Sequence, residues 1–235
     1  MRFQPSPSVD EIPAALRDIE AVVFDFDGTL AELILDFDEM KRIVARAATP
    51  FLRAKPIASA TPVLEWLGEL AGEAETIAAG SGPALTSRAM AAIEAMEVES
   101  AARGVLFPFT RRLLSRLSNL GVHCGIITRN CSKAVRTVFP DVDSHVRVML
   151  ARDDVERPKP HPDHLREALG LLGANPRATL MVGDHPMDMA TAAAAGTRSG
   201  GVASGRLSAA QLRESGADIV ATDCAALFRP LLGTL

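Results

Sequence analysis

Strand-like and helical segments alternate from residue 106 to the end of the chain, and this alternation constrains the fold more than any other feature. Short apolar runs typical of buried strands occupy residues 122–128, 145–150, 178–184, 197–203 and 217–221. A segment with helical spacing follows each run, at 132–139, 162–173, 187–196, 207–216 and the C-terminus. Strands separated by helices in this way favour a parallel sheet that is covered by helices on both faces.

The alternation is interrupted between residues 31 and 105, where the spacing is helical. Helices are expected at 38–47, at 61–77 with Thr61 as N-cap and Pro62 in the first turn, and at about 84–102. The AGSGP segment at 79–83 is expected to be a turn. The predicted fold class is therefore α/β: a Rossmann-like, doubly wound parallel sheet core from residues 1–30 and 106–235, with residues 31–105 inserted as an all-helical cap.

The composition excludes several functional classes. The 235 residues carry a net charge of −4 and lack the dense lysine and arginine surface that binds nucleic acid. No apolar run approaches the roughly 20 residues that a membrane helix needs, and the N-terminal segment has no apolar secretory core. The three cysteines have no CxxC spacing, so reduced thiols are expected. We therefore expect a cytoplasmic protein with no nucleic-acid or membrane partner; the sequence does not specify its oligomeric state.

Polar residues stand at four predicted strand ends, on the edge where an open parallel sheet binds its ligands. In chain order they are Asp25 and Asp27 followed by Gly28 and Thr29, then Thr128, Arg129 and Asn130, then Lys159 between two prolines, and finally Asp184 and Asp188. Each has a structural alternative. Aspartate and threonine cap helices, an acidic residue suits the start of a helix, and a lysine in a loop is commonly solvated.

Considered together, these residues predict a metal site. Carboxylates that converge on one edge of a sheet repel one another unless a cation lies among them. Lys159 supplies only one positive charge, and aspartate oxygens with water are the ligands that Mg²⁺ prefers. Two-residue spacing along an extended strand directs the Asp25 and Asp27 side chains to one face, and it directs Phe26 into the packing of the sheet.

The order of the motifs resembles that of the haloacid dehalogenase superfamily of phosphohydrolases. The matching motifs are DxDGT at 25–29, Thr128 after a strand, Lys159 in a proline-flanked loop, and GDxxxD at 183–188. The chain looks most like the phosphoglycolate phosphatase-like branch, in which a helical cap follows the first motif. The resemblance covers nearly the whole chain. It implies a Mg²⁺-dependent phosphatase that hydrolyses a small phosphorylated metabolite, a phosphomonoester, through an aspartyl phosphate.

The resemblance also implies a role for each motif residue. Asp25 is the expected nucleophile, and Asp27 is the expected acid and base for the leaving oxygen and the attacking water. Thr128 and Lys159 are expected to bind and neutralise the transferring phosphoryl group. The implied Mg²⁺ site comprises Asp25, the carbonyl of Asp27, Asp184 and, behind these or through water, Asp188. Four more residues are assigned to substrate binding: Gly28, Thr29, Arg129 and Asn130.

The chain departs from the family pattern at two places. Related phosphatases often have asparagine directly after the second-motif threonine, whereas here Arg129 intervenes before Asn130, and the sequence leaves open which of them approaches the substrate. His185 stands where serine or threonine is frequent, and we interpret it as a bystander. Three cations on the first cap helix either bind a second anionic group of the substrate or form a solvated helix face: Lys41, Arg42 and Arg46.

Other functions fit the motifs less well. A hydrolytic dehalogenase has no need of Asp27, and a phosphonate hydrolase needs an imine-forming cap lysine, for which only Lys41 and Lys55 are available. A phosphomutase shares every core motif and differs in whether the cap excludes water. A phospho-accepting signalling domain has its aspartate on a later strand, and a non-catalytic binding protein of this fold is expected to have lost a motif residue.

A second DFD triplet, at 36–38, precedes a helical pattern, where Asp36 or Asp38 is expected to cap the helix.

Overall fold

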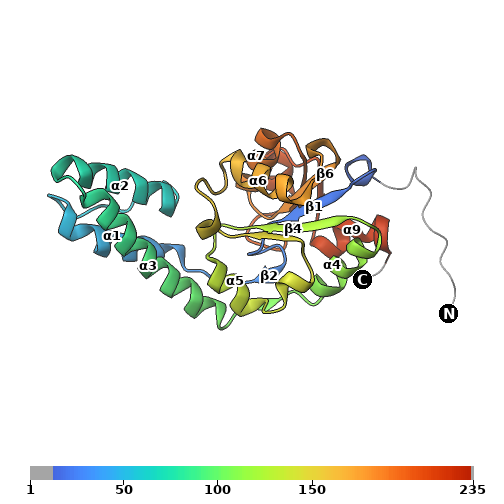
Figure 1. Ribbon diagram of the computed structural model, residues 1–235, viewed down its shortest axis with the longest axis horizontal. Helices are drawn as coiled ribbons and strands as arrows, with labels where there is room; N and C mark the ends of the chain where they lie inside the picture. The colour runs from blue at the N-terminus through green and yellow to red at the C-terminus, as the bar shows by residue number, and fades with distance from the viewer. Residues whose placement is uncertain (1–12, 234–235) are drawn as a thin grey trace. The chain divides into compact units, whose positions relative to one another are not determined.

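The computed structural model describes residues 13–233 (Figure 1). It comprises two compact units. One, the core, contains the described residues up to Leu33 and those from Gly104 onward; the other, the insert, is Ile34–Arg103. The core is the α/β structure that the alternating pattern predicts, and the insert is helical. Each unit encloses buried apolar clusters of its own.

A six-stranded parallel sheet forms the centre of the core, in the order β5-β4-β1-β6-β7-β8. The strands are β1 (Ala21–Phe24), β4 (His123–Ile127), β5 (Val148–Leu150), β6 (Thr179–Gly183), β7 (Arg198–Val202) and β8 (Ile219–Ala221). The chain builds the sheet outward from β1 to β5 and then returns to place β6 on the other side of β1. Residues that follow β1 and β6 therefore lie at the topological switch point, where open α/β sheets bind ligands.

Alternate side chains of β1 face opposite layers of helices. Val22 and Phe24 belong to one apolar cluster, with side chains of α4 (Thr110–Asn119), α5 (Ser132–Val138) and α9 (Cys224–Leu232). Ala21 and Val23 belong to another, with α6 (Pro162–Leu172) and α7 (Pro186–Ala195). Figure 1 shows α6 and α7 on one side of the sheet and α4 and α9 on the other. β1 is thus a central strand that is buried on both faces, as its uninterrupted apolar run predicts.

The insert contains the helices α1 (Phe37–Ala48), α2 (Val63–Ile77) and α3 (Ser81–Ala101), packed around an apolar cluster. Trp66 is buried in this cluster, together with Val63, Leu67 and Leu70 of α2. Asp36 is the N-cap of α1, because its carboxylate accepts a hydrogen bond from the Glu39 N–H at 2.9 Å. The second DFD triplet therefore begins a helix.

Short elements complete the core. β2 (Ala31–Glu32) pairs antiparallel with β3 (Val105–Leu106), where the chain leaves and re-enters the core. Ser208 caps α8 (Ala209–Glu214) by accepting a hydrogen bond from the Gln211 N–H at 3.3 Å. Within residues 13–233, no helix has both the length and the apolar character that a bilayer crossing requires.

The ends of three elements differ from the predicted ones. Pro62, not Thr61, occupies the N-cap position of α2, and the Thr61 hydroxyl instead accepts a hydrogen bond from the Ser59 hydroxyl at 2.7 Å. α3 begins at Ser81, inside the predicted turn, because the Glu75 carboxylate of α2 accepts hydrogen bonds from two N–H groups at its start. β5 begins three residues late, because the N–H groups of His145 and Val146 donate to the Val142 carbonyl and close the turn after the 3₁₀ helix Val142–Ser144.

Candidate active site

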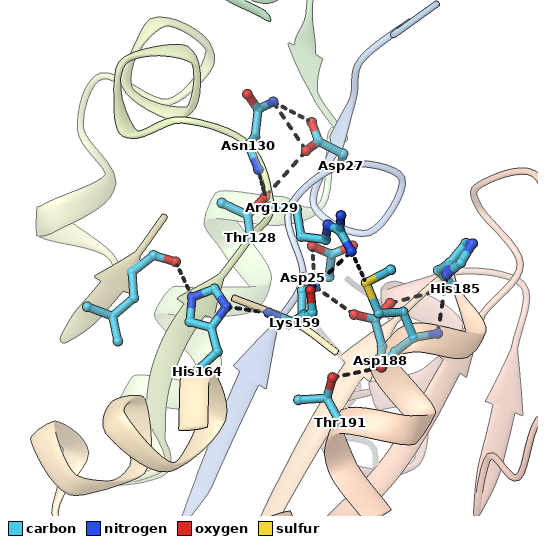
Figure 2. A network of polar contacts seen from close by, with 12 residues as sticks. Asp25, Asp27, Thr128, Arg129, Asn130, Lys159, His164, His185, Asp188 and Thr191 are labelled. Carbon is cyan, nitrogen blue, oxygen red and sulfur yellow. Dashed lines mark hydrogen bonds and ion pairs between the residues drawn. The ribbon is translucent and has the colours of Figure 1, made fainter. Parts of the chain in front are cut away.

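A buried lysine joins two of the predicted carboxylates at the carboxyl edge of the sheet. Asp25 directly follows β1, and its N–H donates to the Val182 carbonyl at 2.8 Å, which continues the pairing with β6. Lys159 Nζ lies 2.8 Å from Asp25 Oδ1 and 2.6 Å from Asp188 Oδ1 (Figure 2). Lys159 is only 3% exposed. Burial by itself lowers the pKa of Lys159, but the two carboxylates outweigh it and raise that pKa above its usual value, so the ammonium group stays charged.

His164 holds the backbone of Lys159 in place. Its ring is fully buried, and Nδ1 accepts a hydrogen bond from the Lys159 N–H at 3.1 Å. Nε2 therefore carries the ring proton and donates it to the Leu150 carbonyl at 3.1 Å. Burial, together with the Lys159 charge, lowers the pKa of His164 to about 4, so the ring is neutral at pH 7. The sequence prediction missed this residue, because nothing in its spacing distinguishes it from the neighbouring His161.

Asp25, Asp184 and Asp188 form an oxygen-rich cluster that fits a divalent cation. Each offers a carboxylate oxygen, and these oxygens lie within 4.8 Å of one another. Burial, with the charges of Asp25 and Asp188, raises the pKa of Asp184 to about 8. Burial also raises the pKa of Asp188 to about 6, although Lys159 opposes the change. One lysine thus leaves the cluster with excess negative charge, and an all-oxygen donor set of this charge suits Mg²⁺.

Two glycines leave the space that the Asp184 carboxylate occupies. A Cβ atom on Gly28 would lie 2.4 Å from Asp184 Oδ2, and one on Gly205 would lie 1.7 Å from the same oxygen. Gly28 also has a φ of 79°, a left-handed conformation that favours glycine. Ser204 donates its hydroxyl to the Gly28 carbonyl at 2.7 Å, so the segment after β7 closes against the turn after β1. Sequence reasoning missed Ser204 and Gly205, because they follow a weak strand and match no motif.

Asp188 and His185 both stabilise the start of α7. Asp188 Oδ2 accepts a hydrogen bond from the His185 N–H at 3.2 Å, while Oδ1 pairs with Lys159. His185 is the N-cap, and its Nδ1 accepts a hydrogen bond from the Met187 N–H at 3.2 Å. The imidazole nitrogen thus accepts the capping hydrogen bond that a serine or threonine hydroxyl accepts at the N-termini of other helices. The prediction that His185 takes no part in chemistry is compatible with this structural role and stays a prediction.

Asp27 lies in a different group of contacts from Asp25. Asn130 Nδ2 is 3.2 Å from each carboxylate oxygen of Asp27, and Thr128 Oγ1 is 3.4 Å from Oδ2. Phe26, between the two aspartates, is fully buried in the core, as predicted. Figure 2 shows the separation: Asp25 points toward Lys159 and Asp188, and Asp27 points toward the segment that follows β4.

The other predicted substrate-binding residues differ in exposure. Thr29 is fully buried, and its hydroxyl has no hydrogen-bond partner within the described part of the chain. Arg129 is partly exposed, and one guanidinium nitrogen lies 3.1 Å from the Lys159 carbonyl and 3.3 Å from the Met187 sulfur. Arg129 therefore lies beside the lysine, whereas Asn130 lies against Asp27. Contact of Gly28, Thr29, Arg129 or Asn130 with a substrate remains a prediction.

The three cations of α1 have partners within the insert. Arg42 Nε and Arg46 Nη2 lie 2.6 and 2.7 Å from the two carboxylate oxygens of Glu39. Lys41 Nζ donates to the Ser59 carbonyl at 2.6 Å. Because each cation has such a partner, these contacts favour a solvated helix face over a dedicated anion site.

Comparison with known proteins agrees with the family resemblance. The family model described as haloacid dehalogenase-like hydrolase matches residues 22–202, which include every predicted site residue. The chain is 29% identical over 216 residues to a phosphoglycolate phosphatase of Shigella dysenteriae, a match that covers 80% of this chain and 83% of that protein. It is 38% identical over 89 residues to the pyrophosphatase PpaX of Anoxybacillus flavithermus, but that match covers only 37% of this chain and 41% of the pyrophosphatase.

A solved structure shows the same fold. The haloacid dehalogenase-like hydrolase from Bacteroides fragilis superposes with a TM-score of 0.60 at 24% identity, over 88% of this chain and 98% of that one. The sheet order, the acidic cluster beside Lys159 and the family match over most of the chain lead to one assignment. The chain belongs to the haloacid dehalogenase-like hydrolase family, and its relatives include phosphatases.

Proposed function

We propose that the protein is a Mg²⁺-dependent phosphatase that hydrolyses a small phosphomonoester through an aspartyl phosphate on Asp25. The position of Asp25 carries the proposal. Its carboxylate belongs to one cluster of ligand oxygens with Asp184 and Asp188, and it lies 2.8 Å from the buried Lys159. A carboxylate that attacks a phosphate dianion needs positive charge close to both partners, and this cluster provides one cation and the donor set for a second.

The proposed metal ligands are the carboxylates of Asp25 and Asp184, with Asp188 behind them or bound through water, because its two oxygens already contact Lys159 and the His185 N–H. Mg²⁺, when bound there, would neutralise these carboxylates and the phosphoryl oxygens of the substrate. Gly28 and Gly205 support the arrangement, because each leaves room for the Asp184 carboxylate. The carbonyl of Asp27, a ligand that the family resemblance implies, is part of the proposal as well.

The first chemical step transfers the phosphoryl group to the protein. An Asp25 carboxylate oxygen attacks phosphorus, the bond from phosphorus to the leaving oxygen breaks, and Asp27 gives that oxygen a proton. Lys159 balances the negative charge that gathers on Asp25 and the phosphoryl group. Thr128 directs its hydroxyl proton toward a phosphoryl oxygen.

The second step releases phosphate. Asp27, now ionised, takes a proton from a water molecule as that water attacks phosphorus. The bond between phosphorus and the Asp25 oxygen breaks, phosphate leaves, and both carboxyl groups return to their starting protonation states. Asp25 and Asp27 have different neighbours, since one carboxylate pairs with Lys159 and the other contacts the side chains of Asn130 and Thr128, which supports separate roles for the two groups.

We propose a substrate class, phosphomonoesters of small metabolites, rather than a single compound. The phosphoglycolate phosphatase and the pyrophosphatase named above act on different substrates, and the pyrophosphatase match covers less than half of that protein. A phosphomutase or a phosphonate hydrolase on the same core is the alternative. Reaction products distinguish the three.

A phosphate-release screen tests the proposal. Purified protein is incubated with phosphoglycolate, sugar phosphates, nucleotides, pyrophosphate and phosphonates, and inorganic phosphate is measured. We expect release from at least one monoester, which EDTA abolishes and added Mg²⁺ restores. Asp25→Asn should abolish release, whereas Ser132→Ala, a nearby change at the start of α5, should not. Undiminished release by Asp25→Asn would contradict the proposal, and an isomerised substrate without phosphate release would identify a mutase.

A further inference from the structure

The side-chain amide of Asn130 has one defined orientation. Its Oδ1 accepts a hydrogen bond from the Cys131 N–H at 2.9 Å, and a backbone N–H can only donate. Nδ2 must therefore face the other way, where it lies 3.2 Å from both Asp27 oxygens. Asn130 is 2% exposed, so little water competes for these contacts. The amide thus sits between the two oxygens of the Asp27 carboxylate.

Thr128 contacts the same carboxylate. Its hydroxyl oxygen accepts a hydrogen bond from the Asn130 N–H at 3.1 Å, so its proton is available for Asp27 Oδ2 at 3.4 Å or for a substrate oxygen. Both donors come from the three residues that follow β4, and Asp27 follows β1, the strand beside it. Pairing of two neighbouring strands therefore sets the distance between Asp27 and its donors.

With this contact, Asp27 faces the segment that follows β4 and not the acidic cluster. Asp25, two residues earlier, pairs with Lys159 in the site where a cation would bind. A second carboxylate that turned toward those positive charges would compete with Asp25 for them and would no longer face the leaving oxygen. Asn130 is uncharged, so it orients Asp27 without adding a charge to the site.

We propose that Asn130 is a positioning residue that holds Asp27 in the orientation needed for proton transfer, rather than a substrate-binding residue. This inference rests on the proposed function, in which Asp27 protonates the leaving oxygen. The other role of Asn130 is structural, since its Oδ1 caps the Cys131 N–H at the start of α5. Two variants separate these roles: Asn130→Ala removes both contacts, and Asn130→Asp keeps an oxygen for the Cys131 N–H while removing the amide donor.

The test compares two leaving groups. An alkyl phosphate that the screen identifies as a substrate needs a proton on its leaving oxygen, whereas p-nitrophenyl phosphate has a leaving group that departs without one. The measured quantity is kcat/KM, because it reports the steps up to the first phosphoryl transfer and omits hydrolysis of the aspartyl phosphate. We expect Asn130→Ala and Asn130→Asp to lower kcat/KM about 10- to 100-fold for the alkyl ester, and less than about 3-fold for the aryl ester. Asp27→Asn should show the same selectivity, and Ser132→Ala should change neither value.

A second measurement does not need activity. In isotope-labelled protein, the side-chain amide signals of Asn130 are identified by their absence in Asn130→Ala. We expect these signals to shift in Asp27→Ala and to stay in place in Ser132→Ala.

The outcomes separate the two proposals. The positioning role would be overturned if kcat/KM falls equally for both esters, or if the Asn130 amide signals do not shift in Asp27→Ala. Either result would leave the phosphatase proposal standing. Absence of phosphate release from every ester by the wild-type protein would overturn the proposed function, and with it the inference that depends on it.

Discussion

Replacing Asp184 by asparagine should stabilise the metal-free protein and remove its response to Mg²⁺. Asp184 is partly buried beside two other carboxylates, and these surroundings raise its pKa from 3.8 to about 8. An acid whose pKa is higher in the folded state takes up a proton on folding. The free energy of unfolding therefore falls as pH rises from about 4 to about 8, because the unfolded chain gives up the proton first. Asparagine has the same shape and carries no charge, so it avoids this cost.

The size of the effect follows from the pKa values. At pH 7, about three pKa units separate the solution pH from the ordinary pKa of Asp184, and each unit corresponds to about 1.36 kcal/mol. Asp188 belongs to the same cluster and has a pKa of about 6, so the two carboxyls share the cost of the excess negative charge. The contribution of Asp184 alone to the free energy of unfolding is therefore smaller. We therefore expect Asp184→Asn to raise the free energy of unfolding by about 2 to 4 kcal/mol in EDTA at pH 7. The difference should shrink to below about 1 kcal/mol at pH 4, where the carboxyl is protonated in the folded state and roughly half protonated in the unfolded chain.

Mg²⁺ should remove most of this difference in the free energy of unfolding. A ligand that binds only the folded state at 100 times its Kd stabilises by about 2.7 kcal/mol. The wild type should gain this much, and Asp184→Asn, which lacks a ligand carboxylate, should gain little. The assay is urea unfolding at pH 4 to 8, in EDTA and in excess Mg²⁺. The control is Glu69→Gln, which removes one exposed charge from α2 of the insert.

Two results would refute this reasoning. One is an Asp184→Asn protein that is no more stable than the wild type in EDTA at pH 7. The other is a variant that gains as much stability from Mg²⁺ as the wild type does.

Three further predictions concern other parts of the molecule. Lys159→Met should destabilise the metal-free protein by about 3 to 5 kcal/mol in urea unfolding, because it leaves two buried carboxylates without their partner. The same change should reduce phosphate release at least about 100-fold. A variant that is active and as stable as the wild type would contradict the role of this lysine. Gly205→Ala should raise the Mg²⁺ concentration needed for half-maximal phosphate release, because the added Cβ would displace the Asp184 carboxylate. The control Gly170→Ala should leave that concentration unchanged, because the space around its Cβ position is open. Trp66→Ala should cost about 3 to 5 kcal/mol in the unfolding of the insert, followed by far-ultraviolet circular dichroism; a loss below about 1 kcal/mol would show that this side chain is not part of a packed core.

The sheet and the motif residues were predictable because their signals are local. A run such as 21–24 identifies a buried strand from a few neighbouring residues, and the carboxyl edge of a parallel sheet then brings the residues that follow its strands together. Asp25, Lys159 and Asp188 meet as the motifs predict. The cap of α1 at Asp36 has the same local origin, because a capping aspartate and its N–H donor lie three residues apart.

Features that depend on contacts between distant segments were not predictable. Ser204 bonds to Gly28 across 176 positions of the chain, and Asn130 reaches Asp27 across 103. Neither pair has a sequence pattern, because its geometry exists only once the strands have paired. The early start of α3 has a similar cause on a smaller scale, since the capping carboxylate comes from Glu75 in the preceding helix. His164 likewise becomes recognisable only through the backbone group that it binds.

The central claim is that Asp25 accepts the phosphoryl group, and direct detection of that group tests it. Asp27→Asn should still attack p-nitrophenyl phosphate, whose leaving group needs no proton, but should hydrolyse the resulting aspartyl phosphate slowly. Rapid acid quenching, proteolysis and mass spectrometry should then find one phosphoryl group on the peptide that contains Asp25, together with a burst of about one nitrophenol per active site. The opposite result would contradict the account: the wild-type enzyme turns over this ester, but the Asp27→Asn variant shows neither the burst nor a phosphorylated Asp25 peptide.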